Sequence, residues 1–185
     1  MWYNTTEVNT CMKKILIVLC LLVLFSGCQQ KVNVDDSRQE KYDSYIIAVQ
    51  DIEDSKETSA FFDVSCVMNK LSENEYRYDV IIENPKVAMY TVEVLAVETT
   101  VAGTVITDKL MPSVGIFDEV TYNMIPNQVD IEKGYPKGIS VSGVTDRSEI
   151  TLYVMVSWTG GRARAVQSRE FLKVVAAMEQ PSSAE

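Results

Sequence analysis

The sequence predicts an all-β domain in which about seven strands pack face to face as a sandwich. Two observations carry this prediction. From Phe61 onward the apolar residues recur mainly at every second position, which is the period of a strand with one face on a core. Clusters of Gly, Pro, Asn, Asp and Ser separate the alternating segments, and no long run with helical spacing lies between them.

The first two strands are predicted to form a hairpin. The first strand, from Phe61, places four side chains on its apolar face: Phe62, Val64, Cys66 and Met68. The second strand, 76–83, alternates in the same way through Tyr76, Tyr78, Val80 and Ile82. Residues 72–75 lie between them and supply turn-forming side chains. Asn84-Pro85 is expected to end the second strand, because proline has no backbone donor for the ladder.

The remaining strands follow the same pattern. We expect them at residues 89–98, 119–124, 139–144, 150–158 and 164–175. Gly160-Gly161 predicts a tight reversal between the last two. In the strand 150–158, the apolar face carries Leu152, Val154, Val156 and Trp158.

The segment before the strands leaves two interpretations open. Residues 37–40 have the spacing of a helix capping box, and apolar side chains then recur at helical intervals from Tyr42 to Ile52. A first strand at 45–52 is the alternative, because the run Tyr-Ile-Ile-Ala-Val is rich in β-forming residues.

This arrangement resembles the β-sandwiches of immunoglobulin-like and fibronectin-type domains. The resemblance rests on the number and spacing of the strands, because the paired cysteines of many immunoglobulin domains are absent. A closed barrel stays open as an alternative, since a strand count does not show closure.

A different pattern occupies the N-terminal region. Met12-Lys13-Lys14 precedes an uncharged apolar run, Ile15 to Phe25, which Ser26-Gly27-Cys28 follows. As a helix this run is about 17 Å long, too short to cross a hydrocarbon core of about 30 Å. A basic start and a short apolar core are typical of a secretory signal peptide.

The residues before Cys28 resemble the lipobox of bacterial lipoproteins, with Phe25 at a position where leucine is usual. The resemblance implies that the Cys28 thiol carries diacylglycerol and that cleavage makes Cys28 the mature N-terminus. Two acyl chains anchor a protein stably in a membrane. The resemblance therefore implies a lipid-anchored protein on the extracytoplasmic side of a bacterial membrane.

These patterns divide the chain into five regions. We interpret 1–11 as an artefact of an upstream start assignment and 12–27 as a lipoprotein signal peptide. Residues 28–44 are predicted to be a polar tether that is helical in part, and 45–176 the β-sandwich domain. Residues 177–185 are expected to form a disordered tail.

The composition weighs against several classes of function. The net charge of -9 and the lack of a basic stripe argue against a nucleic-acid partner. The chain contains no histidine, which removes the commonest general base and metal ligand. Cys66 would be the one cysteine left in the mature chain, and its apolar neighbours indicate a buried structural residue.

Other charged groups are interpreted in the same way. The acidic clusters at 35–36 and 51–54 lack the glycine turn and spaced glutamate of a calcium loop, so we expect solvated faces. The basic residues Arg162, Arg164 and Arg169 are interpreted as a charged hairpin that discourages edge pairing. We expect no metal and no cofactor.

The sequence thus favours a non-catalytic binding or interaction module of the cell envelope. Its expected partners are the membrane, through the acyl anchor on Cys28, and a protein or cell-wall ligand. A carboxylate-dependent enzyme that acts on the cell wall is one alternative, because paired acids work without histidine. An accessory binding component of an export or uptake system is another. Cys28 is the one residue to which the sequence assigns a specific role.

Overall fold

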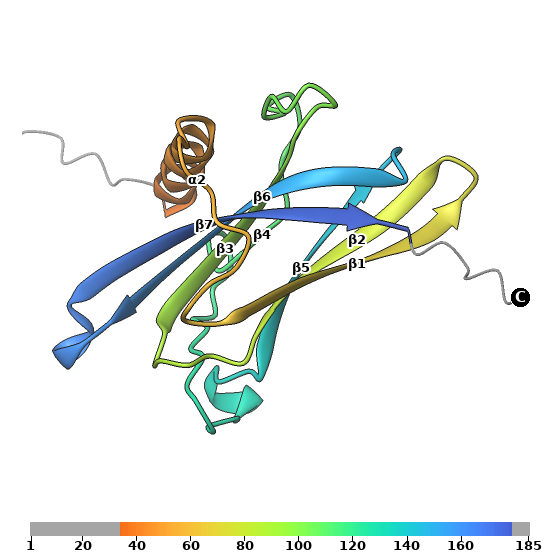
Figure 1. The fold of residues 1–185 in the computed structure, drawn as a ribbon. Coiled ribbons are helices and arrows are strands. Elements are labelled where there is room, and N and C mark those ends of the chain that lie inside the picture. Colours follow the sequence, from red (N-terminus) through yellow and green to blue (C-terminus); the bar gives the residue numbers. More distant parts are fainter. Residues whose placement is uncertain (1–33, 179–185) are drawn as a thin grey trace, which may run out of the picture. The chain divides into compact units, whose positions relative to one another are not determined.

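The computed structural model describes residues 34–178. Within them, seven strands form two antiparallel sheets with one α-helix (Figure 1). Because the strands form two separate hydrogen-bonded sheets, the predicted all-β sandwich is confirmed. The predicted signal peptide (12–27), the residues before it (1–11), Cys28 and the end of the tail lie outside the described residues. No helix within 34–178 is long and apolar enough to cross a membrane.

The smaller sheet has the strand order β1-β2-β5. Its strands are β1 (Asp63–Ser72), β2 (Glu75–Glu83) and β5 (Gly138–Thr145). The predicted hairpin is confirmed, with a two-residue turn between Ser72 and Glu75. The predicted end of the second strand is also confirmed, since β2 stops at Glu83.

The larger sheet has the order β4-β3-β6-β7. Its strands are β3 (Tyr90–Glu98), β4 (Ser113–Val114), β6 (Glu149–Gly160) and β7 (Val166–Ala177). The reversal after β6 occurs where predicted and includes a short 3-10 turn, η2 (Arg162–Arg164), so β7 begins at Val166. A second 3-10 turn, η1 (Ile131–Lys133), precedes β5.

The predicted strand at 119–124 is wrong. Its residues run beside β3 without a continuous ladder. They are joined to it by an isolated bridge from Met124 to Met89 and by the Val92 amide, which donates to Tyr122 O at 2.8 Å. The Thr91 amide also donates to Asn123 Oδ1 at 3.2 Å. The reason lies in β3, where Thr91 has a positive φ of 50° and the pairing with β6 shifts register. This bulge interrupts the regular spacing of donors and acceptors that a ladder needs.

The main core lies between the two sheets, and the faces predicted to be apolar supply it. The smaller sheet contributes Met68, Tyr78, Val80, Ile82, Ile139 and Val141, and Phe62 joins them from the position directly before β1. The larger sheet contributes Val92, Val94, Ala96, Leu152, Val154, Val156, Trp158 and Leu172. The ring of Trp158 lies edge-on to that of Phe62, with centroids 5.9 Å apart.

Residues Val34–Gln50 form the helix α2, so the strand alternative at 45–52 is wrong. The helix runs through residue 45, where the sandwich domain was predicted to begin, and its residues belong to the same compact unit as the strands. Helical spacing decides the outcome, because Tyr42, Tyr45 and Val49 come to lie on one face and are all buried.

That face of α2 packs on the outer side of the larger sheet (Figure 1). It contacts a second apolar cluster formed by Leu95, Val97, Met111, Ile116 and Met155. Polar contacts fix its position. The Glu93 carboxylate accepts hydrogen bonds from Lys41 Nζ at 2.7 Å and from the Tyr45 hydroxyl at 2.5 Å. The Tyr42 hydroxyl accepts a hydrogen bond from the Met111 amide at 2.7 Å.

We expect Tyr42→Phe to lower the free energy of unfolding by about 1–3 kcal/mol, because the buried Met111 amide would lose its acceptor. Urea denaturation followed by circular dichroism measures this change. Tyr153→Phe is the matched control, since Tyr153 is a partly buried tyrosine packed against the same apolar cluster. Equal losses of unfolding free energy in the two variants would contradict a stabilising role for the hydrogen bond from the Met111 amide to the Tyr42 hydroxyl.

Candidate functional site

A buried carboxylate marks one end of the sandwich. Glu98, the last residue of β3, is paired with Leu152 and therefore shares the inner face of the sheet. Only 2% of it is exposed. Its Oε1 accepts hydrogen bonds from the Tyr78 hydroxyl at 3.0 Å and from Lys109 Nζ at 2.7 Å. Arg147 lies 3.6 Å from Oε2. Together, Glu98, Tyr78, Lys109 and Arg147 are called the Glu98 cluster below.

The β2–β5 pairing explains how Tyr78 reaches Glu98. Tyr78 is opposite Gly143 in this pairing, and a Cβ on residue 143 would overlap the Tyr78 hydroxyl. The absence of a side chain at Gly143 therefore leaves the space in which the tyrosine lies. Burial raises the pKa of Tyr78, and the negative charge of Glu98 raises it further. The hydroxyl therefore stays protonated and donates a hydrogen bond to the Glu98 carboxylate.

The two cations of the cluster come from connecting segments. Lys109 lies in the connection between β3 and β4, and Arg147 lies in the turn between β5 and β6. The Arg147 guanidinium donates a hydrogen bond to the Thr99 carbonyl at 2.6 Å, which holds it at the end of β3. The Lys109 side chain is 41% exposed, so its ammonium reaches the buried acid from the surface.

Three hollows adjoin the cluster, with volumes of about 410, 480 and 430 Å³. Glu98 lines the first two, and Lys109 lines all three. The second hollow also has exposed apolar side chains in its wall, which are Leu110, Phe117 and Val144. Lys109 therefore borders all three hollows while its ammonium contacts Glu98.

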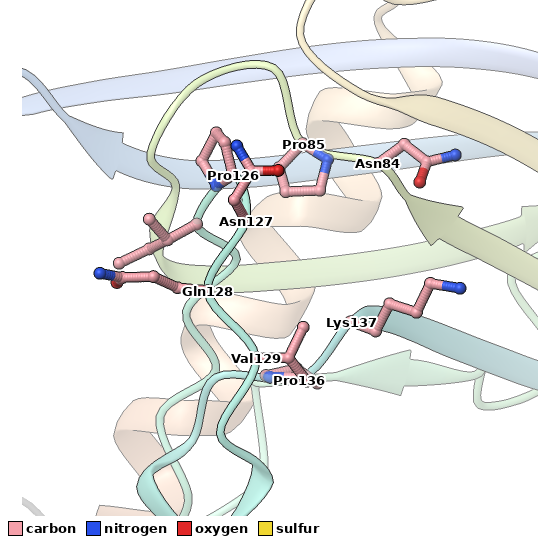
Figure 2. Close-up of a pocket in the computed structure, with 9 residues that line it drawn as sticks. Asn84, Pro85, Pro126, Asn127, Gln128, Val129, Pro136 and Lys137 are labelled. Atoms are coloured by element: carbon pink, nitrogen blue, oxygen red, sulfur yellow. The ribbon is translucent and has the colours of Figure 1, made fainter.

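A further hollow of about 380 Å³ lies at the opposite end of β2 and β5. Figure 2 shows its labelled residues, which come from the two positions directly after β2 and from the segment that leads into β5. Asn84, Asn127 and Gln128 supply amide groups, and Lys137 is its one charged residue. This hollow offers neutral hydrogen-bonding groups, whereas the hollows beside Glu98 offer a buried charge.

The structure also places Cys66, which was interpreted as a buried core residue. It lies on the predicted face and packs against the main core, but it is only half-buried, because β1 is an edge strand. Burial raises the pKa of the Cys66 thiol from 9.0 to about 11, and the negative charge of Asp79 acts in the same direction. This environment opposes formation of the reactive thiolate.

The other groups considered from the sequence are distributed over the surface. No three or more His, Cys, Asp or Glu residues within 34–178 are grouped so that they could hold a metal ion. The guanidinium groups of Arg164 and Arg169 lie 4.0 Å and 4.6 Å from the ring centroids of Tyr90 and Tyr45. Each arginine thus contacts an aromatic ring of its own chain.

The Glu98 cluster was not predicted from the sequence. One signal was present, because Glu98 is in phase with Val92, Val94 and Ala96 and so continues the buried face of its strand. A charged residue in that phase needs a partner. Its partners come from residues 78, 109 and 147, and only the folded chain brings these together.

Comparisons with protein-family models, with curated proteins and with solved structures returned no match to this chain.

We expect Gly143→Ala to lower the free energy of unfolding by about 1–3 kcal/mol, because the new methyl group displaces the buried Tyr78 ring. A double-mutant cycle with Tyr78→Ala tests the cause by chemical denaturation. Gly143→Ala should cost less in the Tyr78→Ala background, where the overlap is removed. The same cost in both backgrounds would rule out the contact as the cause.

The raised pKa of Cys66 gives a kinetic expectation. Near pH 8, alkylation of the folded protein by iodoacetamide should be about 100-fold slower than alkylation of the urea-unfolded chain, because the thiolate fraction falls with the rise in pKa. Mass spectrometry of a tryptic digest follows the modified peptide over time. Comparable rates in the folded and unfolded chains would show that the thiol is not held in its neutral form.

Proposed function

We propose that this chain is a lipid-anchored, extracytoplasmic binding module whose β-sandwich carries no catalytic activity. The observation that carries the location is the segment from Met12 to Cys28, with its basic start, short apolar core and Ser-Gly-Cys end. The acyl anchor on Cys28 joins the sandwich to the membrane. The ligand is a protein or a cell-wall component. The module binds it either as a component of the cell envelope or as an accessory part of an export or uptake system.

The environment of the buried acids supports binding over catalysis. Glu93, Glu98 and Glu170 are all buried, and each carboxylate lies 2.7 Å from a lysine ammonium. A general acid must deliver a proton to its substrate. A carboxylate that already accepts hydrogen bonds from an ammonium group and a hydroxyl group is instead suited to receive donors.

A carboxylate-dependent enzyme is the second candidate. The observation in its favour is that Glu98, Asp108 and Asp146 line one hollow. Glycoside hydrolysis requires two such acids about 5–10 Å apart on either side of the scissile bond. Release of soluble fragments from purified cell-wall glycan, and its loss in Asp108→Asn, would support this candidate and contradict the binding module.

The anchor is tested by Cys28→Ala in the full chain. Because the thioether forms on the Cys28 sulfur, we expect the variant to lose incorporation of an alkyne-labelled fatty acid and to lose mature-size protein from the membrane fraction. Click labelling and immunoblots of fractionated cells measure both.

Cys66→Ala is the matched control, since it removes a thiol from the sandwich and leaves the N-terminal segment intact. It should keep both the label and the membrane retention. Lipid label on Cys28→Ala, or loss of label in Cys66→Ala alone, would contradict the proposed anchor.

A further inference from the structure

We infer that the Glu98 carboxylate is the receptor for an ammonium group at the end of an aliphatic stem, and that Lys109 occupies this receptor when no ligand is bound. The ligand class is a lysine side chain of a partner peptide. The inference rests on the binding role proposed above but is independent of the lipid anchor. Four features of the Glu98 cluster support it.

The first feature is unused hydrogen-bonding capacity. Both donors that contact Glu98 within hydrogen-bond distance, the Tyr78 hydroxyl and the Lys109 ammonium, are bound to Oε1. The Oε2 atom forms an ion pair with the Arg147 guanidinium at 3.6 Å, which is longer than a hydrogen bond. A carboxylate can accept about four hydrogen bonds. Glu98 therefore has capacity for a further donor while it lines two hollows.

The second feature is the net charge around the hollows. The three hollows beside the cluster are lined by four acidic residues, Glu75, Glu98, Asp108 and Asp146. Within residues 34–178, the basic residues that line them are Lys109 and Arg147. The acidic excess lies in the first and third hollows, whereas the second has one charge of each sign, Glu98 and Lys109. The excess of negative charge favours a cation over an anion, and the net charge of -9 on the chain acts in the same direction.

The third feature separates an organic cation from a metal ion. No group of three or more acidic, cysteine or histidine side chains within the described part of the chain could hold a metal. The wall beside Glu98 instead contains Leu110 and Phe117, which are 70% and 36% exposed. A carboxylate beside exposed apolar side chains matches a cation on an aliphatic stem, because the stem covers the wall while the ammonium reaches the acid.

The fourth feature is that Lys109 already shows this mode of contact. Its ammonium lies 2.7 Å from Glu98 Oε1, and Lys109 lines all three hollows. A ligand ammonium would replace the Lys109 ammonium, so one N–H to carboxylate contact is exchanged for another and the buried charge stays paired. Lys109 lies in the connection between β3 and β4 and its side chain is 41% exposed, so the exchange involves a side chain that already reaches solvent.

Competition by Lys109 sets the expected affinities. A side chain tethered close to its receptor competes with an effective concentration on the order of millimolar. Short lysine derivatives should therefore bind the unmodified protein weakly. Removal of the Lys109 charge should strengthen binding by at least about tenfold.

The probe is Nα-acetyl-lysine methylamide, titrated into the full chain in detergent and followed by the backbone amide signals of Gly143 and Arg147. Two reference compounds isolate the chemistry. Nα-acetyl-norleucine methylamide has the stem without the ammonium, and glutarate has negative charge. Lys109→Met removes the resident cation, and Lys133→Met, in an exposed ion pair with Asp130, is the matched control.

We expect Lys109→Met to bind the lysine derivative at least about tenfold more tightly than the wild type or Lys133→Met, with no binding of either reference compound. Glu98→Gln should bind none of the three. If Glu98→Gln does not fold, the comparison of the three compounds on Lys109→Met decides alone.

Equal binding of the lysine and norleucine derivatives, stronger binding of glutarate, or no gain in Lys109→Met would overturn the inference. None of these results bears on the Cys28 labelling experiment, so a wrong ligand class and a wrong anchor are distinguishable. Activity on cell-wall glycan would contradict the proposed function separately.

Discussion

The burial of both faces of β3 is the constraint on which the rest of this structure depends. Val92, Val94 and Ala96 face the core between the sheets, whereas Leu95 and Val97 face α2. An antiparallel strand at the surface of a sandwich has one face in solvent. Here α2 covers that face, so the helix and the strands form one unit. This unit has one apolar cluster on each side of the larger sheet.

This arrangement creates the polar sites as well. The two glutamates of β3 have opposite phases, so Glu93 points toward α2 and Glu98 toward the interior. A buried carboxylate without partners would destabilise the fold. Each of these two carboxylates accepts hydrogen bonds from a lysine ammonium and a tyrosine hydroxyl. The Glu93 contacts lie between the helix and the sheet, and the Glu98 contacts lie at an open end beside three hollows.

The difference between the two sites lies in their surroundings. Lys41 and Tyr45 both come from one turn of α2, which the buried Tyr42 and Val49 also hold in place. Lys109 belongs to the connection between two strands, β3 and β4, and not to a helix, whereas the exposed fractions of the two lysine side chains are similar, 41% for Lys109 and 45% for Lys41. The same chemistry therefore stabilises a packing contact in one place and offers an exchangeable contact in the other. This contrast underlies the proposal that the Glu98 end is where a ligand binds.

The sequence by itself determined the class of fold, because period-two alternation commits each strand to one buried face and punctuating turns set the hairpins. It also contains the N-terminal segment on which the proposed anchor rests. It did not decide between helix and strand for Tyr45 to Ile52, where both patterns fit a short apolar run. Nor did it reveal that 119–124 meets a bulge at Thr91 rather than a regular ladder.

Only the tertiary structure decided the candidate site. Tyr78, Glu98, Lys109 and Arg147 are separated along the chain, and no local pattern joins them. The space for Tyr78 depends on its register opposite Gly143, which is a property of a strand pair. Periodicity reports which face of a strand is buried. Partners of a buried charge depend on which strand ends and loops meet in space, and this is decided when the two sheets pack.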